Sequence, residues 1–155
     1  MKHTKLWREL QTEPGSFARI YQFEPIERVR LVKSGVPANF VSFLSSSMDI
    51  SRDVLYATLG MARATVNRKV RENQLLSLDE SERVLGIARL VGQAETIVKE
   101  SGDPKCFDAA KWTAHWLEEP QPTLGGKRPA ELMDTAEGRS MISDLLARMQ
   151  SGAYA

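Results

Sequence analysis

The amino-acid sequence predicts an all-α protein, on three observations. Helix start and end signals recur along the chain, several stretches space their apolar residues three and four apart, and no stretch shows the alternation typical of a strand. Of the 155 residues, 42% are hydrophobic and 26% are charged, as in a globular chain that buries a core. We expect a helix-turn-helix bundle followed by a helical C-terminal domain.

Composition argues against several classes of protein. No run approaches the roughly 20 apolar residues that cross a bilayer, and the N-terminus lacks the apolar core of a signal peptide, so we expect a cytoplasmic protein. Cys106 is the lone cysteine, and its place on an apolar stripe predicts a buried thiol. His3 and His115 follow no zinc-binding spacing. We therefore expect no metal, no cofactor and, without a recognisable pair of acid and base residues, no enzymatic activity.

The sequence predicts some elements of the N-terminal part more clearly than others. Residues 1–23 form an N-terminal segment with apolar anchors but no clean period, and we leave its structure open. Pro25 then stands in the first turn of a predicted helix, and Gly35 lies just past its end, as is typical of helix termini. A short helix is expected at about 37–46. These two helices begin a helix-turn-helix domain that we place at 24–76.

The stretch DVLYATLGMARATVNRKV fits a helix-turn-helix motif. Ser51 is expected to cap the first helix, and Gly60 allows the tight turn that follows Leu59. Leu55 can pack inward from the first helix, and Val66 can anchor the second helix from its centre. The second helix is therefore the candidate for entering the major groove of DNA.

Charge and residue type support this interpretation. The overall net charge is +1, but residues 51–73 carry five basic and two acidic residues, a local net charge of +3. One departure is Tyr56, which takes a position that usually holds a small residue and is expected to widen the helix crossing or weaken DNA binding. The alternative is an ordinary helical hairpin with solvated arginines. The DNA-binding candidates are Arg63, Thr65, Asn67, Arg68 and Arg71.

Two further helices follow. Ser77 and Glu80 form a capping box for a long helix that reaches about residue 100, and we assign 77–101 as a connecting or dimerisation helix. Asp103-Pro104 is expected to start the next helix, which ends near residue 118. Trp112 and Trp116 lie on one face of it, either in the core or on a partner surface.

The last region, 102–155, contains the stretch PTLGGKRPAELMDTAEG. Two glycines allow backbone angles that other residues avoid, and prolines fix the flanks, so the stretch predicts a rigid turn that sets the direction of the final helix. Asp134 and Glu137 are expected to cap that helix. Its apolar side carries Met141, Ile142, Leu145, Leu146 and Met149.

The chain from about residue 25 to its end resembles the Xre-type antitoxins whose partner toxins carry the RES domain. The resemblance rests on LGMARATVNRKV, on LSLDESERVLGIARLVGQAETIV and, most specifically, on WLEEPQPTLGGKRPAELMDTAEGRSMISDLLARMQSGAYA. It implies an all-helical, dimerising protein that binds and inhibits a toxin and represses its own operon. RES toxins consume NAD, so this chemistry would belong to the partner.

The resemblance places toxin binding in the C-terminal region. A basic pair at the tip of the turn can meet acidic groups of a toxin or remain in solvent, and a free-standing transcription regulator with a sensing or dimerisation domain is the alternative to an antitoxin. The partner-binding candidates are Leu124, Gly125, Gly126, Lys127, Arg128, Met141, Leu145, Met149 and Tyr154.

Overall fold

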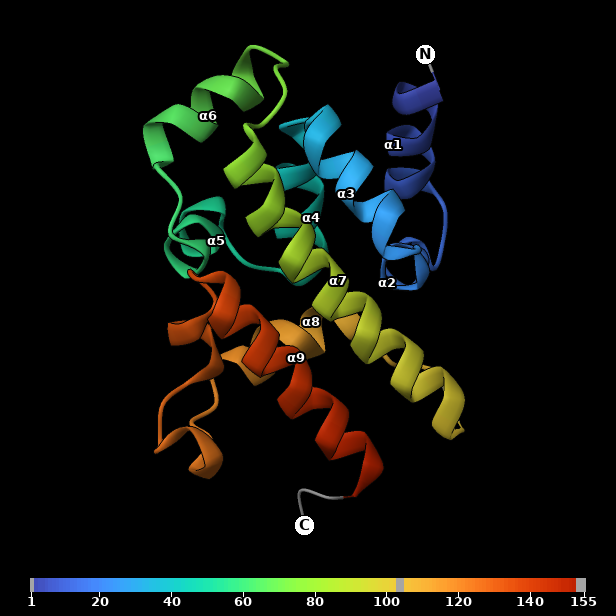
Figure 1. Ribbon diagram of the computed structural model, residues 1–155, viewed down its shortest axis with the longest axis vertical. Helices are drawn as coiled ribbons and strands as arrows, with labels where there is room; N and C mark the ends of the chain where they lie inside the picture. The colour runs from blue at the N-terminus through green and yellow to red at the C-terminus, as the bar shows by residue number, and fades with distance from the viewer. Residues whose placement is uncertain (1, 103–104, 153–155) are drawn as a thin grey trace.

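The computed structural model describes residues 2–102 and 105–152, and within these residues it contains helices and no strand, which confirms the all-α prediction (Figure 1). The elements, in chain order, are α1 Lys2–Thr12, α2 Ser16–Gln22, α3 Pro25–Ser34, α4 Asn39–Met48, α5 Arg52–Leu59, α6 Arg63–Arg71, α7 Leu78–Ser101, α8 Ala109–Leu117, the 3-10 turns η1 Pro122–Leu124 and η2 Pro129–Leu132, and α9 Ala136–Ser151.

The long helix α7 connects the two halves of the molecule. The predicted capping box is present: Ser77 Oγ accepts from the Glu80 amide at 3.1 Å, and a Glu80 side-chain oxygen accepts from the Ser77 amide at 2.8 Å. Apolar residues of α7 are buried on several sides, because α2 packs closely on it, α3 and α9 lie along it and α8 lies behind it (Figure 1). One continuous core runs from Trp7 in α1 to Leu146 in α9.

The N-terminal segment forms two helices, α1 and α2, that pack on this core. The rings of Trp7 in α1 and Phe40 in α4 form a T-shaped pair with centroids 5.0 Å apart, and Phe17 of α2 stacks on Phe43 at 5.5 Å. These contacts join residues far apart in sequence, so the position of α1 and α2 on the core depends on partners that no local pattern identifies.

Two helix starts differ from the predictions. Helix α8 begins at Ala109, where the Asp108 carboxylate accepts from the Lys111 amide at 3.1 Å, and the predicted start at residues 103 and 104 lies outside the described residues. Helix α9 is capped by Thr135, whose hydroxyl accepts from the Gly138 amide at 2.9 Å, and not by Asp134. In α9 the cap is therefore the residue directly before the helix, Thr135, one position later than predicted.

The prediction of a buried Cys106 is wrong. The residue precedes α8 in a left-handed conformation, with φ 65°, and its side chain is exposed. It leaves the apolar stripe because the helix that would have carried it starts later. Trp116 is buried and Trp112 is half-buried, and their rings stack 5.7 Å apart. Trp112 alone of the two is therefore accessible from outside.

Candidate nucleic-acid and protein interfaces

The predicted helix-turn-helix is present. The Ser51 hydroxyl accepts from the Val54 amide at 3.1 Å, which starts α5, and Gly60 ends it with φ 69°. The next amide, that of Met61, returns to the Tyr56 carbonyl at 2.9 Å, so the chain reverses within a few residues. Val66 in α6 is completely buried, as its anchoring role requires.

The DNA-binding candidates all lie on α6, but some of their charges are already paired. Arg63 contacts the Asp53 carboxylate at 3.1 Å, and Arg68 lies 3.8 Å from Glu72. Both pairs are well exposed and therefore weak. Arg71 is exposed and makes no salt bridge within the described residues, and Thr65 is half-buried. Arg71 therefore carries an exposed charge without a salt bridge, whereas Arg63 and Arg68 each have to leave a weak pair before they can bind another group.

Asn67 has a partner that the sequence did not predict. The Tyr56 hydroxyl donates to Asn67 Oδ1 at 2.7 Å, and the Tyr56 ring is 2% exposed between α5 and α6. Burial raises the pKa of the Tyr56 phenol above its ordinary value, which keeps the donor protonated. A bidentate contact with adenine would use the same amide oxygen, so Tyr56 would compete with DNA for Asn67 in the predicted role of this residue.

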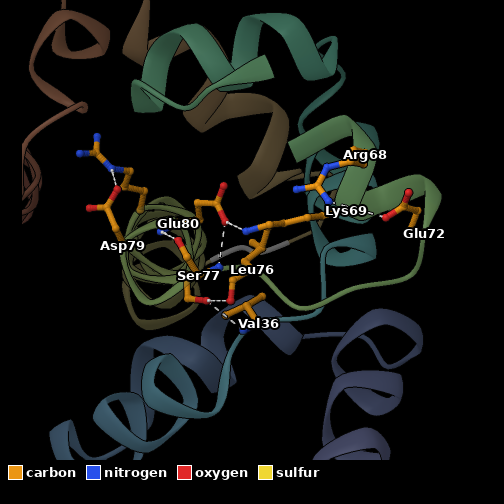
Figure 2. Close-up of polar contacts among 10 residues, drawn as sticks. Val36, Arg68, Lys69, Glu72, Leu76, Ser77, Asp79 and Glu80 are labelled. Atoms are coloured by element: carbon orange, nitrogen blue, oxygen red, sulfur yellow. Dashed lines mark hydrogen bonds and ion pairs between the residues drawn. The ribbon is translucent and has the colours of Figure 1, made fainter. Parts of the chain in front are cut away.

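A second contact ties α6 to α7. Figure 2 shows the Lys69 ammonium reaching the Glu80 carboxylate, 2.5 Å away, with both side chains less than a fifth exposed. Burial raises the pKa of Glu80, but its hydrogen bonds with Lys69 and Ser77 outweigh this effect and hold the pKa below its ordinary value. Lys69 contributed to the local charge in the sequence, but here it fixes the orientation of α6.

The turn between α8 and α9 is closed by its own backbone. Gln121 is buried, its amide donates to the Lys127 carbonyl at 3.0 Å, and its carbonyl accepts from Gly126 at 3.0 Å. Gly125 and Gly126 have φ values of 67° and 84°, as the prediction of unusual backbone angles requires. A methyl group added to either glycine would meet no atom within 4 Å, so the tip of the turn faces open space.

The basic pair at this turn divides into two roles. Arg128 forms salt bridges with Glu118 at the end of α8 and, at 3.7 Å, with Glu131, whose carboxylate also accepts from the Arg128 amide at 2.8 Å. Arg128 thus fastens the turn to its neighbours. Lys127 is exposed and has no salt bridge within the described part of the chain, so it is the cation available to a partner.

The remaining partner-binding candidates differ in how far their side chains are exposed. Met141 is 43% exposed, and Leu124 and Met149 are half-buried. The prediction that Leu145 is part of the partner-binding surface requires a correction. Its side chain points from α9 into the core and is 1% exposed, so it is not on the surface. Tyr154 lies outside the described residues.

Helix α9 is fixed on α7 by a reciprocal polar contact. The Gln93 side-chain amide donates to the Ser143 carbonyl at 2.9 Å, and the Ser143 hydroxyl donates back to Gln93 Oε1 at 2.8 Å. Gln93 is buried, so both of its polar atoms find partners inside the fold. This contact sets the rotation of α9 and therefore which side of it, including Met141, faces outward.

Arg83 joins the helix-turn-helix to the C-terminal region. From α7 its guanidinium donates to the Leu59 carbonyl at the end of α5 and to the Asp134 carbonyl before α9, both at 2.6 Å, and it contacts Asp79 at 3.0 Å. No local pattern in the sequence indicated this role, because the two carbonyls lie 24 and 51 residues away from Arg83. Arg83 therefore fixes the position of the helix-turn-helix relative to the start of α9.

Two other kinds of site are absent from the described residues. No helix among them is long and apolar enough to cross a membrane. Within the same part of the chain, no three side chains of the metal-binding types lie close enough together to hold an ion.

Comparisons with known proteins match both regions. Residues 27–89 match the model of the antitoxin Xre-like helix-turn-helix domain, and residues 94–152 match the antitoxin Xre/MbcA/ParS C-terminal toxin-binding domain. The chain is 42% identical over 144 residues to a Sphingobium protein named Prs ADP-ribosylating antitoxin, covering 93% of this chain and 91% of that protein. It is 25% identical over 88 residues to a Pseudomonas putida protein named Antitoxin Xre, covering 57% and 50% of the two chains.

Proposed function

Because the chain belongs to the Xre/MbcA/ParS family of antitoxins, we propose that it neutralises its toxin by covering the toxin's active site, and represses its own operon through the helix-turn-helix. The observation that carries the first part is the closed turn at 121–127, whose tip presents Gly125, Gly126 and Lys127 to open space. A turn that is ordered before binding loses little conformational entropy when it docks.

An apolar hollow supports the same assignment of the C-terminal region. It has a volume of about 360 Å³ and lies between α7, α8 and α9, with Ile97, Trp112 and Met149 among its lining residues. All of its lining residues fall within the match to the toxin-binding domain. An exposed apolar hollow of this kind suits a hydrophobic side chain of a protein partner.

We propose a RES-domain toxin that consumes NAD as the partner. The support is the resemblance of the C-terminal sequence to antitoxins of such toxins, together with the name of the Sphingobium relative, which links an antitoxin with ADP-ribosylation. Transfer of ADP-ribose uses NAD as its donor. We assign this chemistry to the toxin and no enzymatic activity to this chain, because its sequence contains no recognisable pair of catalytic acid and base residues.

The proposed repression rests on α6. Its exposed Arg68 and Arg71 can neutralise phosphates, and the +3 charge of residues 51–73 is concentrated around the motif. Helix-turn-helix proteins commonly bind two half-sites as dimers, so we propose that two copies of the chain bind the operator together.

Co-expression with the neighbouring reading frame tests the proposal. We expect the neighbour alone to stop growth, the pair to grow, and the two proteins to purify as a complex. Lys127→Glu should weaken rescue, whereas the matched charge reversal Lys111→Glu on the exposed side of α8 should not. A harmless neighbour that never purifies with this chain would contradict the antitoxin assignment and favour a free-standing regulator.

A further inference from the structure

Another hollow, separate from the apolar one between α7, α8 and α9, lies where the helix-turn-helix meets the C-terminal region. It has a volume of about 340 Å³. On one side it is lined by Val54, Ala57 and Thr58 of α5, and on the other by the end of α8 and the turns before α9, with Glu118, Glu131 and Asp134 among the lining residues (Figure 1). Both regions of the chain therefore contribute to it.

The junction between the two sides of this hollow is fixed. A methyl group added to Gly60 would lie 3.0 Å from the β-carbon of Asp134, so the end of α5 touches the turn before α9. The Arg83 guanidinium donates to the last carbonyl of α5 and to the Asp134 carbonyl, and thus joins the same two segments. The hollow is therefore formed before any partner binds, and an occupant has little to reorganise.

The residues that line the hollow carry an excess of negative charge. Three of them are carboxylates and one, Arg128, is a guanidinium, so their net charge is 1 − 3 = −2. Arg128 forms salt bridges with Glu118 and Glu131. The third carboxylate, that of Asp134, makes no salt bridge within the described residues. A cation from outside the chain would therefore be attracted to this hollow.

Two arginines near Asp134 do not cancel this charge. Arg83 touches Asp134 only at the backbone carbonyl, and it pairs with the Asp79 carboxylate at 3.0 Å. Burial and the nearby Arg83 lower the pKa of Arg139. The carboxylates of Glu82, Asp79 and Asp134 act in the opposite direction, so Arg139 is shared among three acidic groups. The Asp134 carboxylate is thus able to bind a further cation.

The α5 side of the hollow is apolar. Val54 is 45% exposed, and because Val54 and Ala57 are three residues apart they lie on one face of the helix. The opposite face carries Leu55 and Leu59, which are buried in the core. A lysine or arginine side chain combines an apolar stem with a charged end, so its stem can lie on this face while its end reaches the carboxylates.

We propose that this hollow receives a lysine or arginine side chain of the toxin, so that α5 is part of the toxin-binding surface. The inference rests on the proposed neutralisation and adds to it a contact in the helix-turn-helix domain. Residues 118–134 lie within 94–152, the match to the toxin-binding domain, whereas α5 lies within 27–89. Lys127 at the exposed tip of the turn directly precedes Arg128, so a toxin that docks on the tip lies beside the hollow.

The charge of the hollow favours a protein over DNA. Its excess of carboxylates repels phosphates, whereas a basic side chain complements it. The candidates for DNA binding also lie on a different helix, α6, and none of them lines the hollow. The proposed toxin contact therefore uses the first helix of the motif and not the second.

The sign of the charge at position 54 tests the inference. The full chain is titrated in a calorimeter with the purified product of the neighbouring reading frame. Val54→Lys places a cation beside the toxin's cation and should weaken binding at least about tenfold. Val54→Glu adds an anion and should bind at least as tightly as the wild type. Asp134→Asn removes the carboxylate without a salt bridge and should weaken binding about threefold.

Val29→Lys is the matched control. Val29 lies on α3, is also 45% exposed and does not line this hollow, so this variant should bind as the wild type does. Val54→Glu serves as the control for folding, because retained binding shows that a charged side chain at position 54 is compatible with the fold.

Three results would overturn the inference. Equal weakening by Val54→Lys and Val54→Glu would mean that the loss does not depend on charge. Unchanged binding in both variants would exclude a toxin contact here, and a loss in Lys127→Glu would then leave the proposed neutralisation intact. A Val54→Lys variant that binds the operator more tightly in gel shift, with unchanged toxin affinity, would assign the hollow to DNA. A neighbour that never binds the wild type removes the proposed function itself, and this inference with it.

Discussion

The hydroxyl of Tyr56 donates a hydrogen bond to Asn67 Oδ1, 2.7 Å away, across the two helices of the helix-turn-helix. The sequence predicted a disturbance at Tyr56, because its ring replaces the small residue usual at this position. The structure buries the ring and uses its hydroxyl to hold α6, the helix that we propose contacts DNA. The residue therefore has a role in positioning α6.

Removing that hydroxyl should destabilise the fold. We expect Tyr56→Phe to lower the free energy of unfolding by about 1 kcal/mol, since one partly buried hydrogen bond is lost. Asn67→Ala should lose a similar amount, and the double variant should lose clearly less than the sum of the two. Urea unfolding measures all three. Strictly additive losses would show that the contact contributes nothing.

DNA binding should depend on the exposed arginines of α6. Arg68→Ala and Arg71→Ala are each expected to reduce operator affinity and to lower the slope of log affinity against log salt by about one, as expected for one lost phosphate contact. Toxin rescue should be unchanged. Gel shifts over a salt series measure the slope, with Lys111→Ala as the control. If both variants keep the wild-type slope, α6 does not contact the phosphates.

The Glu80 carboxylate should make the free energy of unfolding depend on pH. Its pKa is lower in the fold than in the unfolded chain, so its contribution is present above the ordinary glutamate pKa of about 4.3 and is lost as pH falls through the lower folded value. Glu80→Gln should therefore cost about 1 to 2 kcal/mol at pH 7 and less at pH 3. Unfolding in urea at the two pH values gives the difference.

The control for this experiment is Glu72→Gln, which replaces an exposed carboxylate that lies 3.8 Å from Arg68. It should change stability little at either pH. An equal loss in Glu80→Gln at pH 7 and pH 3 would mean that the charge of Glu80 does not stabilise the contact with Lys69.

A side chain at the tip of the turn before α9 should make this turn less ordered. Gly125 has φ 67° but open space around it, so Gly125→Ala meets a backbone penalty of about 1 kcal/mol and no clash. The turn is then ordered for less of the time, and toxin affinity is expected to fall about fivefold. Titration calorimetry with the purified toxin measures this change.

Thr123→Ala is the matched control within the same turn. Position 123 does not have a left-handed backbone conformation, and both glycines remain in this variant. It should bind as the wild type does. Unchanged affinity in Gly125→Ala would show that the order of the turn is unimportant for the toxin.

Local signals explain what the sequence predicted well. The cap at Ser51, the turn at Gly60 and the capping box of Ser77 and Glu80 each depend on residues three or four apart, and all three are present. The glycine angles at the turn before α9 are equally local. The fold class and the helix-turn-helix could therefore be predicted from the sequence alone.

Features that depend on distant residues could not be predicted. Helices α1 and α2 are held by contacts such as that of Trp7 with Phe40, and Arg83 joins carbonyls of two separate regions. The burial of Leu145 depends on how α9 lies on α7, which its apolar stripe alone does not determine. The stripe indicated an apolar side but not whether the core or a partner covers it.

Hydrogen exchange of the chain, measured alone and in complex with its toxin, decides whether the toxin and DNA use separate surfaces. We predict that the toxin slows exchange in residues 121–132 and in α9 and leaves α6, the helix assigned to DNA, unchanged. Slower exchange confined to α6, with residues 121–132 exchanging as fast as in the free chain, would contradict the separation of the two interfaces.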